Sequence, residues 1–224
     1  MNLQGRLIWK FKSYKTSRWR KESLSALEMC LKYLDARKIN GSFLEFGTHF
    51  GDIPLHAEFL FSKRKSGYSR RDIVVFDSFQ GLPGSILSSE AKIFRKGEFS
   101  FSLEKYLLRL SKYKVPPKHI RIYPGWFKET LQTTNEEHTI ALAWIDADLF
   151  SSTETVLNFL TNRLADQALI AIDDYWVAKL NSGGPSLALE RWIRGKDKPF
   201  NFSLQPWRSF HCFGEIFVFN KVEN

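Results

Sequence analysis

The sequence predicts an α/β fold with seven strands in a mostly parallel sheet and helices on both faces. Short apolar runs alternate with amphipathic stretches along most of the 224 residues. Strands separated by helices pair in parallel, and both faces of such a sheet are covered. The last two apolar runs flank Gly214 too closely for a crossover helix, so they predict a C-terminal antiparallel hairpin at the edge of the sheet.

The predicted strands are short apolar runs, many of them β-branched. Asp72–Phe76 has the sequence DIVVF, and Thr139–Ile145 has the sequence TIALAWI. Such runs are typical of buried strands. The complete set is Ser42–Phe46, Asp72–Phe76, His119–Tyr123, Thr139–Ile145, Ala168–Ile172, Phe210–Phe213 and Glu215–Asn220.

The predicted helices carry apolar residues three or four positions apart. Ser151–Leu164 begins with hydroxyl residues that can cap a helix, and Pro185–Ile193 has a proline in its first turn. Gln80–Ser89 contains glycines and a proline, which predict a loop. The complete set of helices is Ser23–Leu34, Gly51–Phe61, Leu103–Leu110, Ser151–Leu164 and Pro185–Ile193.

The composition indicates an ordinary globular chain. Hydrophobic residues make up 43% and charged residues 25%, and no apolar stretch is long enough to span a membrane. Two cysteines, Cys30 and Cys212, form neither a disulfide framework nor a metal knuckle. The segment Met1–Phe11 is too short and too charged for a signal peptide. We therefore expect a soluble, cytoplasmic protein.

The net charge of +9 is concentrated at the N-terminus, where residues 1–21 hold seven basic side chains and no acidic one. We expect residues 1–40 to form a basic helical arm or lid, and residues 41–224 to form the main domain. A basic arm can contact a polyanion through residues 6–21. We favour a solvated helical face or a lid over a pocket instead.

Five predicted strands end at a glycine or an aspartate: Gly47, Asp77, Gly125, Asp146 and Asp173. Turns favour these residues in any protein, so one such end is uninformative. Parallel sheets, however, bind ligands at the carboxyl ends of their strands. Five such ends on one edge predict a binding site.

The first two strand ends suggest a nucleoside site. Gly47 and Gly51 lie four apart between a strand and a helix, which allows close approach of a ligand, although this is not G-x-G-x-x-G. Asp52 at the helix start disfavours a pyrophosphate but tolerates an ammonium group. Asp77, at the end of the second strand, is placed to bind ribose hydroxyls. The alternatives are a plain tight turn and a turn-forming aspartate.

Four carboxylates follow the next two buried strands: Asp146, Asp148, Asp173 and Asp174. An unpaired cluster of this kind repels itself. A hard cation such as Mg²⁺ or Mn²⁺ relieves that repulsion. The alternative is neutralisation by lysines such as Lys179. The five histidines are scattered, so we expect surface or core roles for them: His49, His56, His119, His138 and His211.

In order and spacing, several blocks resemble the macrocin O-methyltransferase (TylF-like) family of class I S-adenosylmethionine-dependent methyltransferases. The resemblance covers roughly residues 23–220. It implies a Rossmann-like fold, with residues 41–224 as a class I methyltransferase domain, and methylation of a sugar hydroxyl with Mg²⁺. The blocks are EFG at 45–47, DSFQGLP at 77–83, PGWFKETL at 124–131, DADLFSST at 146–153 and IDDY at 172–175.

The resemblance also implies roles for individual residues. Asp77 would bind the ribose, Trp126 would lie near the adenine, and Glu45 and Gly47 would face the methionine part. Asp148 would be the general base. The implied metal ligands are Asp146, Asp173 and Asp174. The full cofactor-binding set is Glu45, Gly47, Thr48, Gly51, Asp77, Ser78, Phe79, Gly125, Trp126 and Asp146.

Three alternatives remain open at this point. The basic arm is compatible with a nucleic-acid methyltransferase. A small phenolic or catechol acceptor would use similar carboxylate chemistry. A non-catalytic binding domain could keep the fold. Within the sugar hypothesis, the acceptor is a small molecule or a glycan, and the resemblance suggests a homodimer.

Overall fold

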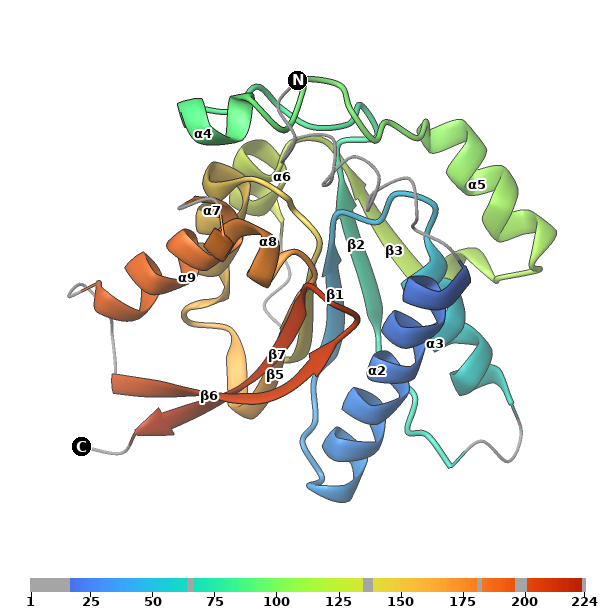
Figure 1. The fold of residues 1–224 in the computed structure, drawn as a ribbon. Coiled ribbons are helices and arrows are strands. Elements are labelled where there is room, and N and C mark those ends of the chain that lie inside the picture. Colours follow the sequence, from blue (N-terminus) through green and yellow to red (C-terminus); the bar gives the residue numbers. More distant parts are fainter. Residues whose placement is uncertain (1–16, 64–66, 135–138, 181–182, 196–200, 223–224) are drawn as a thin grey trace.

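The computed structural model describes residues 17–63, 67–134, 139–180, 183–195 and 201–222. They form a seven-stranded sheet with the strand order β3-β2-β1-β4-β5-β7-β6 (Figure 1). Strands β1 to β5 pair in parallel, whereas β7 runs antiparallel to both β5 and β6. This arrangement confirms the predicted fold class. The strands are β1 Ser42–Phe46, β2 Ile73–Asp77, β3 Ile120–Pro124, β4 Ile140–Ile145, β5 Leu164–Ile172, β6 Asn201–Phe210 and β7 Gly214–Val222.

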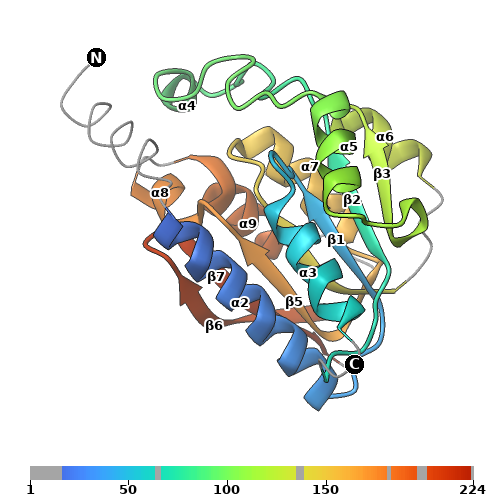
Figure 2. The same ribbon diagram turned by 90° about the vertical axis from the view of Figure 1, so that its right-hand side faces the viewer.

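Helices cover both faces of the sheet (Figures 1 and 2). Helices α2, α3 and α5 contribute to one hydrophobic cluster, and α6, α7 and α9 to another. The helices are α2 Ser17–Ala36, α3 Asp52–Ser62, α4 Ser88–Ala91, α5 Leu103–Lys112, α6 Phe127–Thr133, α7 Phe150–Leu160, α8 Tyr175–Leu180 and α9 Gly184–Arg194, with a 3₁₀ turn η1 at Pro117–His119. No described helix has the length and apolar character required to cross a membrane.

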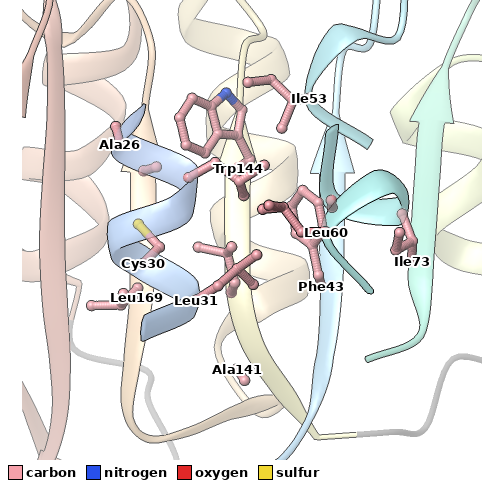
Figure 3. Packing of buried hydrophobic residues seen from close by; sticks show 14 of the residues in the cluster. Ala26, Cys30, Leu31, Phe43, Ile53, Leu60, Ile73, Ala141, Trp144 and Leu169 are labelled. Atoms are coloured by element: carbon pink, nitrogen blue, oxygen red, sulfur yellow. The ribbon is translucent and has the colours of Figure 1, made fainter. Parts of the chain in front are cut away.

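The two clusters lie on opposite faces because successive side chains of a strand alternate between faces. In β1, for example, Phe43 belongs to the first cluster and Leu44 to the second. Helix α2 lies over β4 and β5, where Cys30 and Leu31 pack near Trp144 (Figure 3). These side chains are at most 1% exposed, and burial of each large one stabilises the fold by about 1.5–3 kcal/mol. Helix α2 is therefore part of the core.

Three expectations about element boundaries were wrong. Helix α7 ends at Leu160 and β5 begins at Leu164, so the predicted helix was too long and the predicted strand too short. The strand expected at Phe210–Phe213 is instead the end of a longer strand, β6, followed by a turn in which His211 has a positive φ of 39°. Edge strand β6 alternates between exposed and half-buried residues over most of its length and contains Pro206, which hides its apolar pattern.

Three short helices, α4, α6 and α8, were not predicted from the sequence. The helices α6 and α8 contain seven and six residues, too few to show a helical period. Helix α4 begins at the end of the segment expected to be a loop. Cys30 is buried, Cys212 is exposed, and both are free thiols. Residues 6–16 of the basic arm and His138 lie outside the described residues.

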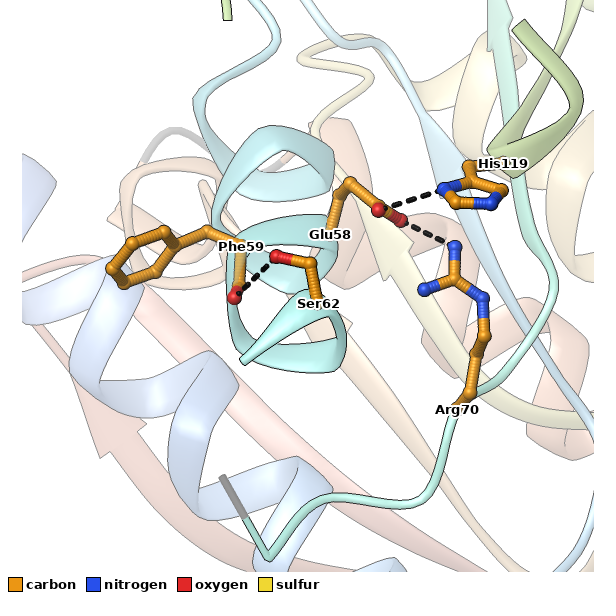
Figure 4. A network of polar contacts seen from close by, with 5 residues as sticks. All are labelled: Glu58, Phe59, Ser62, Arg70 and His119. Atoms are coloured by element: carbon orange, nitrogen blue, oxygen red, sulfur yellow. Dashed lines mark hydrogen bonds and ion pairs between the residues drawn. The ribbon is translucent and has the colours of Figure 1, made fainter. Parts of the chain in front are cut away.

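An ion-pair network centred on the buried Glu58 carboxylate lies at the amino ends of β2 and β3, away from the predicted site at the carboxyl ends of the strands. Figure 4 shows its side chains. The Glu58 side chain is only 6% exposed. It accepts from Arg70 at 2.7 Å and contacts His119 Nδ1 at 2.8 Å. Because Arg70 and His119 precede β2 and β3, the network joins α3 to the amino ends of these strands. We assign this network a structural role.

Candidate active site

Two cavities open where the carboxyl ends of the parallel strands meet. The larger has a volume of about 470 Å³ and the smaller about 350 Å³. They share His49, Phe99 and Asp146 as lining residues, so they meet near the end of β4. We call them the larger cavity and the smaller cavity.

Most residues of the predicted cofactor set line one of these cavities. The larger is lined by Gly47, Asp77, Ser78, Gly125, Trp126 and Asp146. The smaller is lined by Glu45, Thr48 and Asp146. The remaining two, Gly51 and Phe79, line neither. Gly51 lies against the Tyr106 ring, and the Phe79 ring centroid is 5.4 Å from that of Tyr106.

The Asp77 carboxylate organises the loops that line the larger cavity. Its Oδ2 accepts from the main-chain N–H groups of Thr48 at 2.7 Å and His49 at 3.2 Å, and its Oδ1 accepts from that of Phe79 at 2.7 Å. The loop after β1 and the loop after β2 are therefore joined through one side chain. A carboxylate has about four acceptor positions, so at least one remains for a ligand hydroxyl.

Gly47 allows β1 and β4 to approach closely below the cavities. Its φ is 85°, a value that side chains disfavour. A Cβ at this position would lie 2.0 Å from the carbonyl oxygen of Asp146. Glycine is thus required here by the backbone, which agrees with the sequence argument for close approach at this loop.

Within the described part of the chain, three buried side-chain atoms near the end of β1 lack a hydrogen-bond partner. Glu45 Oε2, Thr48 Oγ1 and Tyr106 OH are all buried and have no hydrogen-bond partner among the described residues. Burial raises the pKa of Glu45 well above its usual range, and the nearby Asp146 and Asp77 carboxylates add to this. A buried polar atom without a partner is unfavourable. A ligand with an N–H or ammonium group at this place would satisfy it.

Three of the four predicted carboxylates gather at one place. Oxygens of Asp146, Asp148 and Asp174 lie within 4.8 Å of one another. Asp173 makes a different contact, since its Oδ1 lies 3.1 Å from His211 Nε2. The structure thus groups Asp148 with two of the predicted ligands. The side chain of Lys179, the alternative neutralising group, is not among those the structure describes.

No local pattern in the sequence predicts the side chains that contact Asp173 and Asp52. His211 was expected to be a surface or core residue, and its side chain is indeed buried, at 4% exposed; it also lines the smaller cavity, which was not expected. Burial lowers the pKa of His211, yet the hydrogen bond to Asp173 and the nearby carboxylates outweigh this and raise it overall. No spacing signal links residues 38 positions apart.

Asp52 does occupy the first turn of α3, but it is not free to meet an ammonium group alone. It pairs with Arg20 of α2 at 2.8 Å and also with Arg109 of α5. These pairs connect the start of α2, beside the smaller cavity, to α3 and α5. Trp19, next to Arg20, also lines the smaller cavity.

Comparison with known proteins assigns the family. The model of the macrocin-O-methyltransferase (TylF) family matches residues 15–182. The chain belongs to this family. Among solved structures, the O-methyltransferase NovP has a TM-score of 0.73 at 22% identity, over 88% of this chain and 79% of that one. The calicheamicin methyltransferase CalS11 has a TM-score of 0.65 at 21% identity, over 88% and 78%. These two likenesses concern the fold.

Two curated relatives are more similar to this chain in sequence than these structures are. One is the 8-demethyl-8-(2,3-dimethoxy-alpha-L-rhamnosyl)-tetracenomycin-C 4'-O-methyltransferase of Streptomyces olivaceus, 28% identical over 68% of this chain and 59% of that protein. The other is the mycinamicin III 3''-O-methyltransferase of Micromonospora griseorubida, 28% identical over 69% and 63%. The matched region spans less than two thirds of the length of either relative.

Proposed function

We propose that this chain is an S-adenosylmethionine-dependent O-methyltransferase that acts on a sugar hydroxyl of a small molecule or glycan, with Mg²⁺ or Mn²⁺. The observation that carries the proposal is the meeting of the two cavities at Asp146. A methyl transfer needs a donor and an acceptor aligned at one point, because alignment supplies much of the rate. The curated relative whose name includes a rhamnosyl group and a 4'-O-methyltransferase activity supports the acceptor class.

The larger cavity fits the nucleoside end of the cofactor. Asp77 keeps acceptor capacity for ribose hydroxyls after binding its three main-chain N–H groups. Trp126 supplies an aromatic wall for an adenine. In the smaller cavity, the unsatisfied Glu45 Oε2 suits the ammonium group of the methionine part. These three groups make distinct requirements, and S-adenosylmethionine meets all of them.

The gathered carboxylates fit a hard divalent cation. Asp146, Asp148 and Asp174 offer only oxygen ligands, and carboxylate oxygens are the donors that Mg²⁺ and Mn²⁺ prefer. Asp173, the fourth carboxylate, lines the smaller cavity together with Asp146 and Asp174, and one of its oxygens is engaged by His211. When bound, such a cation would lower the pKa of an acceptor hydroxyl.

Residues of the chain would accept the hydroxyl proton and exclude water from the acceptor. Asp148 lines the larger cavity beside Asp146, where it is placed to take the hydroxyl proton as the oxygen accepts the methyl group. Trp19 and Phe50 line the smaller cavity and would exclude water from the acceptor. The acceptor enters from this side, and its apolar parts would pack on the rings.

A methyl-transfer assay tests the proposal. The purified chain is mixed with methyl-labelled S-adenosylmethionine and one acceptor at a time. The acceptors are a panel of deoxysugar glycosides, catechol and RNA, and each is tested with Mg²⁺ and with EDTA. We expect label on the glycosides with Mg²⁺ and a strong loss in EDTA. Label on catechol alone or RNA alone would replace the sugar acceptor by that alternative. No label on any acceptor, with no cofactor binding, would overturn the proposed function.

A further inference from the structure

We propose that His211 is a positioning residue that holds the Asp173 carboxylate in place for the cation. The inference rests on the proposed function, because it concerns the same carboxylate site. His211 comes from the turn between β6 and β7, far along the chain from β4 and β5. Its Nε2 lies 3.1 Å from Asp173 Oδ1.

The hydrogen bonds of His211 specify which ring nitrogen carries the proton. Nδ1 lies 3.1 Å from the main-chain nitrogen of Phe213 and 3.2 Å from that of Gly214. Main-chain N–H groups can only donate, so Nδ1 must accept through its lone pair. The proton of the neutral ring is therefore on Nε2, and Nε2 donates to Asp173. The turn thus presents a directed N–H donor to the carboxylate.

The ring has little freedom to turn away from this contact. His211 has a φ of 39°, in the left-handed region that closes the turn. Its ring lies against that of Trp19, with centroids 6.0 Å apart and planes at 28°. Trp19 also contacts Phe213 edge-on, at 5.5 Å and 84°. The start of α2 and the β6–β7 turn therefore fix the imidazole from two sides.

Asp173 is held from its main chain as well. Its N–H donates to the carbonyl of Ile145, the last residue of β4, at 2.9 Å. With Oδ1 bound to His211, the carboxylate can rotate only by breaking that bond, and Oδ2 is the oxygen left for a cation. Partners of this kind, which orient a metal ligand from behind, are worth about 10- to 100-fold in metal affinity.

Two substitutions of His211 separate the effect of its N–H hydrogen-bond donor from the effect of its ring shape. His211→Phe keeps an aromatic ring against Trp19 but removes the N–H donor, whereas His211→Gln keeps an N–H donor. We expect Mn²⁺ affinity, measured by calorimetry and electron paramagnetic resonance, to fall by about 10- to 100-fold in His211→Phe. His211→Gln should recover part of this loss. S-adenosylmethionine affinity should stay at the wild-type value in both.

A matched control comes from the Glu58 network at the amino ends of β2 and β3. His119 also contacts a carboxylate, Glu58, through one ring nitrogen. His119→Gln should leave Mn²⁺ affinity unchanged. Combining His211→Phe with Asp173→Asn should cost no more Mn²⁺ affinity than Asp173→Asn alone, since both changes remove the same support.

Nitrogen NMR of the wild-type imidazole provides a readout that does not depend on a variant folding. The neutral ring is measured at alkaline pH, because the pKa of His211 is raised. We expect the Nε2–H tautomer there, and the Nδ1–H tautomer would overturn the inference. Unchanged Mn²⁺ affinity in His211→Phe would also overturn it while leaving the proposed function intact. A wild-type chain that binds no Mn²⁺ would overturn both the metal site and the role of His211. Loss of S-adenosylmethionine binding is a separate result, which would contradict the donor site.

Discussion

The two cavities are built in different ways, although they meet at one aspartate. The larger cavity is organised by main-chain groups, since Asp77 accepts three N–H groups from the loops that follow β1 and β2. The smaller cavity is built from side chains of distant segments, including Trp19 of α2, Asp173 after β5 and His211 in the last turn. The shape of the larger cavity thus depends on the loops at the strand ends, whereas that of the smaller cavity depends on how remote elements pack together.

We call the larger cavity, proposed for the methyl donor, the donor side, and the smaller cavity with the carboxylates the acceptor side. Because the two are built differently, substitutions in them should have different effects. Changes to the strand-end loops should alter cofactor affinity, because those loops hold the shape of the larger cavity. Changes to the carboxylates should alter the rate and the metal dependence while cofactor affinity remains. The following three predictions test this separation.

The largest effect is expected at Asp148. Asp148→Asn removes a proton acceptor from the carboxylate group and should lower the methyl-transfer rate by about 100- to 10,000-fold. Cofactor affinity should change much less than the rate, because Asp148 lines the larger cavity but takes no part in the main-chain network around Asp77. Rate and affinity are measured by label transfer and calorimetry. The control is Asp72→Asn, an exposed aspartate at the amino end of β2 that pairs with Arg121; an equal loss there would contradict the assignment.

Gly47→Ala should have the next largest effect, and it should act on the donor side. The strained backbone alone costs about 1–3 kcal/mol, and the added methyl would collide with the Asp146 carbonyl. We expect a lower melting temperature and weaker cofactor binding. The comparison is Gly84→Ala, where an added Cβ meets no atom within 4 Å and stability should be retained. Equal melting temperatures for the two variants would refute the close-approach argument.

The smallest effect concerns Glu45 and pH. Because burial raises its pKa, the folded chain binds a proton that the unfolded chain releases above about pH 4.5. The free energy of unfolding of the cofactor-free protein should therefore fall as pH rises from that value through the raised pKa. Glu45→Gln resembles the protonated form and should reduce this slope. Urea unfolding at a series of pH values measures it; identical slopes would show that Glu45 is ionised in the fold.

The sequence predicted the donor side well because its information is local. A strand end, a glycine and an aspartate at the next strand end were sufficient to place Gly47 and Asp77 at one edge of the sheet, where the structure has them. The strands themselves were found because buried parallel strands are continuous apolar runs. The roles of these residues toward a cofactor remain predictions.

The acceptor side could be predicted only in part. The four aspartates were recognised, but their mutual orientation depends on side chains from elsewhere in the chain. His211 could not be assigned because its partner Asp173 is 38 positions away, and because its turn was predicted as a strand. The arginine pairs of Asp52 likewise join three helices that no local pattern connects.

The most direct measurement is S-adenosylmethionine binding by calorimetry, on wild type and Asp77→Ala, with Mg²⁺ and with EDTA. We predict wild-type binding that persists in EDTA and is at least about 10-fold weaker in Asp77→Ala, since a hydrogen bond to a charged group is worth about 1.5–3 kcal/mol. Deoxyribose analogues of S-adenosylhomocysteine on the wild type should lose a similar factor, which separates ribose contacts from loop disruption. Absence of binding under every condition would contradict the donor site and the methyltransferase proposal that depends on it.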